Sequence, residues 1–146
     1  FAKATLAGEP IDVYNEGNMV RDFTYVSDIV ENIFRLLPHP PQPNTEWDSA
    51  QPDPATSSAP YRILNIGNSA PVQLMEYINA LEAALGIEVK KNLMSMQPGD
   101  VPATFADVSS LEAITHFRPS TPVKEGVRRF IEWYKSYYKV EETVGS

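Results

Sequence analysis

The residue with the clearest chemical potential is an arginine in an otherwise acidic chain. Arg21 stands between the turn-forming run Asn15–Gly17 and the aromatic stretch Phe23–Tyr25. Arginine can bind a phosphate through two parallel hydrogen bonds, and it stays charged at any working pH. The residues alone leave two interpretations open: a phosphate ligand, or a surface ion pair with Asp22 or another acid.

A carboxylate offers complementary chemistry in the stretch QPGDVPAT, residues 97–104. Pro98 and Gly99 predict a tight turn that projects Asp100. Such a carboxylate could accept hydrogen bonds from both hydroxyls of a ribose, as at many nucleotide sites. A turn-stabilising or helix-capping aspartate would have the same local sequence. Tyr14 poses a similar choice, because its ring could lie against a base or simply pack in the core.

The printed sequence lacks the motifs of most nucleotide-dependent enzymes. No glycine-rich phosphate loop follows a predicted strand, and no Walker-type loop occurs. None of the seven tyrosines is followed four residues later by lysine. His39 and His116 are far apart in the sequence, and the absence of cysteine excludes disulfides and thiolate metal sites. We therefore expect no catalytic residue and no metal site in this chain, only binding chemistry.

Composition indicates one acidic domain. With 146 residues, 42% of them apolar, the chain can build one core. A formal net charge of −7 argues against a general nucleic-acid binder, but one or two local cations could still hold a nucleotide. No apolar run reaches the roughly 20 residues of a membrane span, and no signal peptide opens the chain. We expect a cytoplasmic location. Because Phe1 opens a predicted helix, we also expect a segment from the C-terminal side of a larger protein.

The elements predicted around Arg21 are short. Alternating apolar residues predict a strand over residues 11–17 that ends in a turn. RDFTYV, residues 21–26, predicts a second strand, and Ser27 is placed to cap the following helix. Asp28 in its first turn suits the helix dipole. The predicted apolar face of that helix consists of Ile29, Val30, Ile33, Phe34, Leu36 and Leu37.

Residues 38–60 interrupt this pattern. They hold seven of the 13 prolines, and proline removes backbone donors and fixes φ. We interpret them as a surface loop and not as a linker, because the elements on either side are too few for two cores. The sequence therefore predicts one domain over residues 1–140 that carries this loop, and a frayed tail over residues 141–146.

Strands and helices alternate after the loop. Tyr61–Asn68 predicts a buried strand. Apolar residues at helical spacing predict a helix over Leu74–Leu85, and Gly86 is a typical C-terminal stop. Ile87–Met94 predicts a further strand.

Two more helices complete the prediction. Asp107 or Ser109 could cap a short one. The last helix is predicted to have Thr121 as its cap and Pro122 in its first position. The fold class is mixed α/β, with short strands and three main helices.

Taken in order, these segments resemble the C-terminal portion of the extended short-chain dehydrogenase/reductase family, whose members have a Rossmann-type fold. The similarity is strongest to nucleotide-sugar epimerases of the UDP-glucuronate 4-epimerase type. It covers most of the chain outside the proline-rich loop and the tail. The segments that carry it are FAKATLAGEPIDVYNEGNMVRDFTYVSDIV, YRILNIGN, MQPGDVPATFADVSSL and FRPSTPVKEGVRRFIEWYKSYY.

The resemblance implies substrate-binding roles for four residues. Tyr14 matches a position on the strand that borders the uracil. Arg21 matches the arginine that holds the diphosphate, and Asp100 matches an acid that binds the ribose hydroxyls. Gln97 falls at a phosphate-binding position where several relatives carry arginine and the glucuronate-type branch carries glutamine.

The resemblance also implies the chemistry of the parent protein. In such enzymes an N-terminal Rossmann part binds NAD, and a Ser or Thr, a Tyr and a Lys act on the sugar. The tyrosinate takes the proton from the hydroxyl at carbon 4 while hydride passes to NAD. The keto-sugar turns over and takes the hydride back on its other face, converting UDP-glucuronate to UDP-galacturonate. Since these groups precede the matched region in the family, we expect this chain alone to bind no NAD and to epimerise nothing.

Other functions stay open at this point. The parent could be another nucleotide-sugar epimerase or a dehydratase of the family. The chain could also be a non-catalytic UDP-sugar binding module, or a structural interaction domain without a small ligand. We expect a UDP-sugar as ligand and neither nucleic acid nor membrane as partner. Apolar surface left exposed could support a homodimer.

Overall fold

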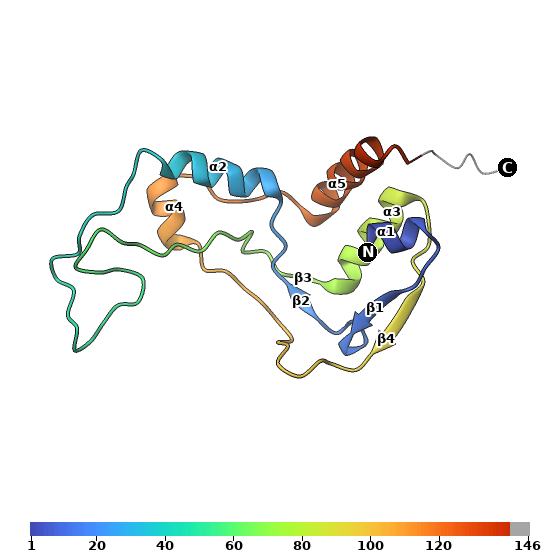
Figure 1. Cartoon of the computed structure of the whole chain (residues 1–146), viewed down its shortest axis with the longest axis horizontal. Helices are drawn as coiled ribbons and strands as arrows, with labels where there is room; N and C mark the ends of the chain where they lie inside the picture. The colour runs from blue at the N-terminus through green and yellow to red at the C-terminus, as the bar shows by residue number, and fades with distance from the viewer. Residues whose placement is uncertain (141–146) are drawn as a thin grey trace.

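The computed structural model describes residues 1–140 and shows a mixed α/β fold (Figure 1). Two groups of elements can be distinguished. Helices α1, α3 and α5 lie with strands β1 and β4, while α2 and α4 lie together away from them (Figure 1). The predicted tail at 141–146 is outside the described residues. The elements are α1 (Ala2–Leu6), β1 (Ile11–Tyr14), the 3₁₀ helix η1 (Asn15–Gly17), β2 (Val20–Arg21), α2 (Val26–Leu36), β3 (Val72–Gln73), α3 (Leu74–Leu85), β4 (Lys91–Met94), α4 (Ser109–Thr115) and α5 (Val123–Tyr138).

The core forms where α3 packs against α5 and strand β1. The prediction of a helix over Leu74–Leu85 is confirmed, and Gly86 ends it in the left-handed conformation at φ 71°. Glycine adopts this conformation without strain, which is why it terminates helices. The apolar spacing on α3 brings Ile78 and Leu81 into full burial beside Val13 and Ile131.

Two short sheets of two strands each hold Tyr14 and Arg21, two of the predicted site residues. Strands β1 and β4 run parallel, with Ile11 opposite Lys91. Strands β2 and β3 run antiparallel, with Arg21 opposite Val72. The predicted strand RDFTYV was therefore too long, because it ends at Arg21. Its antiparallel partner β3 begins at Val72, and the same register would place Asp22 opposite Pro71, which has no backbone N–H to donate, so the ladder stops there.

The predicted buried strand at Tyr61–Asn68 is wrong. No strand forms there in the described structure, and Ile63 is 52% exposed. Within the described residues, the backbone of this segment makes one isolated bridge, between Arg62 and Thr56, and one hydrogen bond, from the Ile63 amide to the Ala55 carbonyl. A run of apolar residues becomes a strand only where a neighbouring strand accepts its backbone hydrogen bonds.

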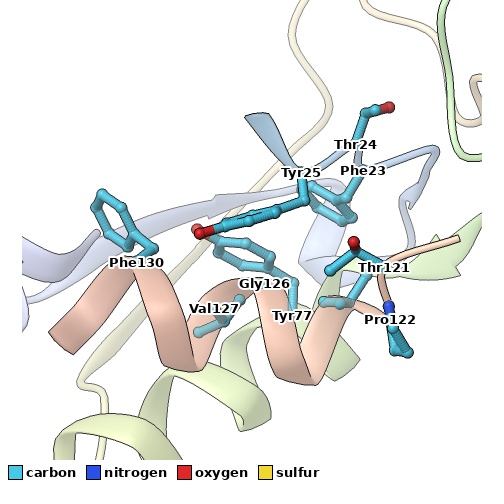
Figure 2. A pocket seen from close by; sticks show the side chains of 10 residues that line it. Phe23, Thr24, Tyr25, Tyr77, Thr121, Pro122, Gly126, Val127 and Phe130 are labelled. Atoms are coloured by element: carbon cyan, nitrogen blue, oxygen red, sulfur yellow. The ribbon is translucent and has the colours of Figure 1, made fainter. Parts of the chain in front are cut away.

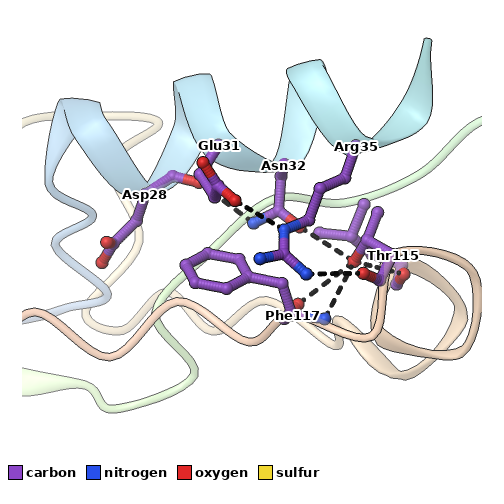
Figure 3. Close-up of polar contacts among 7 residues, drawn as sticks. Asp28, Glu31, Asn32, Arg35, Thr115 and Phe117 are labelled. Atoms are coloured by element: carbon purple, nitrogen blue, oxygen red, sulfur yellow. Dashed lines mark hydrogen bonds and ion pairs between the residues drawn. The ribbon is translucent and has the colours of Figure 1, made fainter.

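Helix α2 is tied to α4 by a buried polar network (Figure 3). Asn32 is fully buried, and its amide donates to the Asp28 carbonyl while its oxygen accepts from the Thr115 hydroxyl. Arg35 pairs with Glu31 and donates to the Thr115 carbonyl. These bonds satisfy polar groups that burial would otherwise leave unpaired.

The predicted caps of two helices are displaced by one or two residues. Helix α2 begins at Val26 with Tyr25 at its N-cap, so Ser27 lies inside the first turn. Helix α5 begins at Val123 with Pro122 at its N-cap. Thr121, predicted as the cap, instead donates its backbone N–H to the buried Asp28 carboxylate.

At the start of α4, Val108 is the N-cap, and Asp107 lies one residue before it. The Asp107 carboxylate accepts from the Ser109 hydroxyl and amide. These bonds hold the pKa of Asp107 below its usual value.

The proline-rich residues 38–60 form no helix or strand in the described structure. Side chains close several local turns within the segment. Asn44 donates to the Thr56 hydroxyl, and the Trp47 indole donates to the Asp53 carbonyl. In Figure 1 the segment projects beyond α2 and α4, away from the α3–α5 core.

Much of the predicted apolar face of α2 is exposed, although Ile29 and Leu36 are half-buried. Within residues 1–140 the main packing partner of α2 is α4, and one side of α2 meets solvent. None of the helices within residues 1–140 has both the length and the apolar character that crossing a bilayer requires. The exposed large apolar side chains of this region are Val26, Val30, Ile33, Phe34 and Leu37.

Candidate functional site

The turn that carries Asp100 forms as its sequence predicts. Gly99 takes φ 84°, a left-handed conformation that glycine adopts without strain. The Asp100 amide closes the turn by donating to the Gln97 carbonyl at 3.2 Å. Asp100 Oδ1 also accepts the Val101 amide at 3.0 Å, which fixes the direction of the carboxylate.

Arg21 is positioned by strand β2 and by its own backbone. One Nη donates to the Val20 carbonyl at 2.9 Å, and the other lies 3.2 Å from Asp100 Oδ1. The two side chains are 24% and 33% exposed, so water and ligands can reach both. The structure thus brings together two residues that are 79 positions apart. The ion pair that the sequence left open, with Asp22 or another acid, does form, and its partner among the described acids is Asp100 and not Asp22.

Three of the four predicted site residues share one groove of about 410 Å³. Tyr14, at the end of β1, lines it together with Arg21 and Asp100. Gln97 is exposed on the turn and does not line the groove. The groove falls within the usual size of small-ligand sites. Its remaining lining residues are Phe1, Asp12, Met19, Asp22, Phe23, Leu74 and Thr104.

The side chains of this groove can supply binding chemistry. Its one cation, Arg21, lies at a rim that also holds carboxylates and the Thr104 hydroxyl. A guanidinium can bind phosphate oxygens in pairs, and the Asp100 carboxylate can accept hydroxyl protons. Within residues 1–140, no cluster of histidine and acidic residues could hold a metal ion.

The described residues do not fit a dinucleotide cofactor. A Rossmann cradle requires a glycine-rich turn that leads from a parallel strand directly into a helix. Here β1 leads into the 3₁₀ helix η1, and β4 leads into the loop that contains the 97–100 turn. Neither parallel strand therefore presents a helix N-terminus to a pyrophosphate.

A second pocket, of about 240 Å³, lies between the segment Phe23–Tyr25 and helix α5 (Figure 2). Tyr77 and Phe130 form part of its wall, and no charged side chain lines it. Burial raises the pKa of the Tyr77 phenol, so this hydroxyl stays protonated at neutral pH. Without a cation the pocket cannot hold a diphosphate, so the groove at Arg21 is the better candidate site.

The sequence did not identify two of the groove residues, Asp22 and Thr104, as contributors to the site. Asp22 appeared only as a possible partner of Arg21, yet its carboxylate accepts backbone amides from Ser69 and Ala106. Thr104 accepts the Asp22 amide. No local pattern marks such contacts, because their partners are 47 to 84 residues away along the chain.

Comparison with known proteins gives concordant matches in sequence and structure. Residues 1–49 match the model of the NAD dependent epimerase/dehydratase family. Protein CapI of Staphylococcus aureus is 54% identical over 139 residues, which is 95% of this chain and 42% of that protein. A probable UDP-glucuronate 4-epimerase of Rhizobium meliloti (strain 1021) is 46% identical over 147 residues, 98% of this chain and 42% of that protein. The chain is thus similar over residues 1–49 to the NAD dependent epimerase/dehydratase family, and over nearly its whole length to relatives that are about half identical to it.

The fold of this chain matches the C-terminal portion of Rossmann-type epimerases. The structure of MoeE5 in complex with UDP-glucuronic acid and NAD superposes with a TM-score of 0.70 at 29% identity. The superposition covers 93% of this chain and 40% of MoeE5. The chain thus spans about two fifths of the length of the relatives that it matches.

Proposed function

We propose that this chain is the substrate-binding part of an NAD-dependent nucleotide-sugar 4-epimerase that converts UDP-glucuronate to UDP-galacturonate. The observation that carries the proposal is the meeting of Arg21 and Asp100, 3.2 Å apart, in a groove that Tyr14 also lines. The name of the Rhizobium relative and the ligand of MoeE5 support the choice of UDP-glucuronate.

In this proposal the groove holds the nucleotide in place while the keto-sugar turns its other face toward the hydride donor. Arg21 binds the diphosphate, Asp100 accepts the ribose hydroxyls, and Tyr14 borders the uracil. Gln97 reaches the phosphates from the exposed turn. An epimerase that passes through a keto intermediate must release the sugar ring to rotate, so its binding energy has to come from the nucleotide. Contacts limited to uracil, ribose and diphosphate meet that requirement.

The remaining parts of the proposal concern the whole protein. Residues 1–140 form one substrate-binding domain, and the parent enzyme supplies the NAD site and the catalytic residues. The protein works in the cytoplasm and provides a charged sugar donor for polysaccharide biosynthesis. This chain by itself binds no NAD and is inactive.

The two alternatives differ in what the groove would select. Another epimerase or a dehydratase of the family would keep the nucleotide contacts and change the sugar. A non-catalytic UDP-sugar binding module would bind tightly without any partner. Competition of UDP-glucuronate with UDP-glucose and UDP-N-acetylglucosamine on the parent protein separates the sugars. Micromolar binding of UDP-sugars by this chain alone would favour the module.

The proposal predicts a specific effect of Arg21→Ala on binding of UDP. Titration calorimetry should show weak binding to the chain, and the variant should lose about 1–3 kcal/mol, the scale of a charged hydrogen bond. Arg62→Ala is the matched control, since Arg62 is exposed and lies outside the groove. Equal loss in both variants would contradict the proposal. Turnover of UDP-glucuronate by the chain alone would refute its inactivity.

We also propose that the chain forms a homodimer through the exposed face of α2. This face presents Val30 and Phe34 at 57% and 68% exposure, and solvent-exposed apolar clusters favour association. Sedimentation equilibrium should show a dimer, and Phe34→Glu should restore the monomer. Tyr137→Glu on α5, at a comparably exposed position, should leave the dimer intact. A monomeric wild-type chain would contradict this proposal.

A further inference from the structure

Three segments that are distant in sequence meet at Asp22. One carboxylate oxygen, Oδ2, accepts the Ser69 amide at 3.0 Å and the Ala106 amide at 3.2 Å. The Asp22 amide donates to the Thr104 hydroxyl at 3.2 Å. Asp22 thus joins the end of strand β2 to residues 67–69 and to residues 104–106. Carboxylates that accept two backbone amides hold their partners more firmly than neutral acceptors do.

The junction around Asp22 is closely packed. A Cβ atom placed on Gly67 would lie 2.3 Å from the Ala106 Cβ and 2.9 Å from Asp22 Oδ2. Ser69 takes φ 53° and donates its hydroxyl to the Ala106 carbonyl at 2.8 Å. Such close contacts leave little room for the segments to slide past each other.

The second carboxylate oxygen indicates a role other than plain stabilisation. Asp22 Oδ1 is buried and has no hydrogen-bond partner among residues 1–140. A buried polar atom without a partner destabilises a fold and calls for an explanation.

The position of Asp22 in the chain supplies the explanation. It follows Arg21 directly, and the Thr104 that it contacts is four residues after Asp100. The backbone supports the same link, because the Thr104 amide donates to the Val20 carbonyl at 3.1 Å. Arg21 and Asp100 therefore lie on two chain segments that Asp22 connects.

We propose that Asp22 is a positioning residue that sets the separation and orientation of Arg21 and Asp100. As a nucleotide-site role this rests on the proposed function, but the geometry can be tested without ligand. In Asp22→Asn, one side-chain oxygen remains to accept amides, while an added NH₂ group must occupy a place beside amide donors or the buried site of Oδ1. In the first case the NH₂ group opposes the N–H groups of Ser69 and Ala106, and in the second a neutral oxygen holds both amides more weakly than the carboxylate did. Either outcome loosens the junction, and the position of the arginine changes with it.

The first test follows the guanidinium of Arg21 by ¹⁵N NMR in the ligand-free chain. Asp100→Asn gives the reference signal for a broken pair. Asp22→Asn should move the Arg21 signal toward that reference. The matched control is Asp28→Asn, since Asp28 Oδ2 also accepts two backbone amides, from Ser120 and Thr121, far from the groove. If Asp28→Asn leaves the Arg21 signal unchanged, the effect belongs to the Asp22 junction.

The second test measures binding of UDP to the same variants. Asp22→Asn should weaken binding of UDP about tenfold. This is the lower end of the loss of affinity that follows when a group that orients a binding residue is removed. In an Arg21→Ala background the same substitution should have a smaller effect, because only the contact of Asp100 can then be lost. Should Asp22→Asn fail to fold, Thr104→Val removes only the oxygen that accepts the Asp22 amide, and a smaller shift of the Arg21 signal is expected.

The outcomes separate the two proposals. An unchanged Arg21 signal in Asp22→Asn and in Thr104→Val would overturn the positioning role. An equal loss of UDP affinity with and without Arg21 would overturn it as well. If wild-type chain and parent protein fail to bind UDP while the Arg21 signal moves as expected, the proposed function fails and the positioning role stands.

Discussion

Replacing Gly67 with alanine is expected to lower the free energy of unfolding by about 3 kcal/mol, the upper part of the usual range for an overpacked site. The added Cβ would lie 2.3 Å from the Ala106 Cβ, well inside van der Waals contact. It would also lie 2.9 Å from Asp22 Oδ2, so the segment can retreat only by disturbing the bonds of that carboxylate. Urea denaturation followed by circular dichroism measures the loss.

The double variant Gly67→Ala, Ala106→Gly is the control for this prediction. It removes the Cβ atom that the new methyl group would strike, and it should recover more than half of the lost stability. Gly8→Ala is a second control, because nothing lies within 4 Å of a Cβ built at that position. Gly8 has φ 71°, so that variant reports conformational strain alone, about 1 kcal/mol. If the double variant were no more stable than Gly67→Ala, steric overlap would not be the cause.

The second large effect is expected at the α3–α5 core. Leu81 is fully buried, and Leu81→Ala should destabilise the chain by about 2–5 kcal/mol through lost apolar burial and the cavity left behind. Leu93→Ala is the matched control, since Leu93 is 58% exposed and should cost about 0.5 kcal/mol or less. Thermal and urea unfolding of both variants provide the comparison. A similar loss for both leucines would mean that the α3–α5 contact is not the main core.

The two effects bear differently on the site. Gly67 lies at the junction that holds Arg21, so Gly67→Ala should also weaken binding of UDP. Leu81 is outside the groove, and Leu81→Ala should reduce stability while binding by the folded fraction changes little. Measuring affinity and stability together therefore distinguishes damage to the site from damage to the core.

Local chemistry made several elements predictable from the sequence. The helix over Leu74–Leu85 and its stop at Gly86 follow from apolar spacing and from the freedom of glycine, and neither needs a distant partner. The Gly99 turn and its projected carboxylate are local in the same sense. The choice of Arg21 and Asp100 as candidate residues also came from the sequence, because side-chain type fixes what each can bind.

Prediction failed where hydrogen-bond partners are remote. Tyr61–Asn68 has the apolar character of a buried strand, but no strand lies beside it to complete a ladder among the described residues. The RDFTYV strand ends after Arg21 for a related reason, since Pro71 would lie opposite Asp22 and has no backbone N–H to donate. The caps of α2 and α5 moved because the Asp28 carboxylate takes backbone amides from the α4–α5 connection.

The sequence by itself determined which groups could recognise a nucleotide and where the main helices run, since both depend on residues that are adjacent or one helical turn apart. Only the tertiary structure decided that Arg21 pairs with Asp100 and not with Asp22, that Tyr14 shares their groove, and that Gln97 lies outside it. The physical reason is that these relations depend on contacts across 79 or more residues, such as those of Asp22 with Thr104 and Ala106. Packing sets such contacts, and no local pattern encodes them.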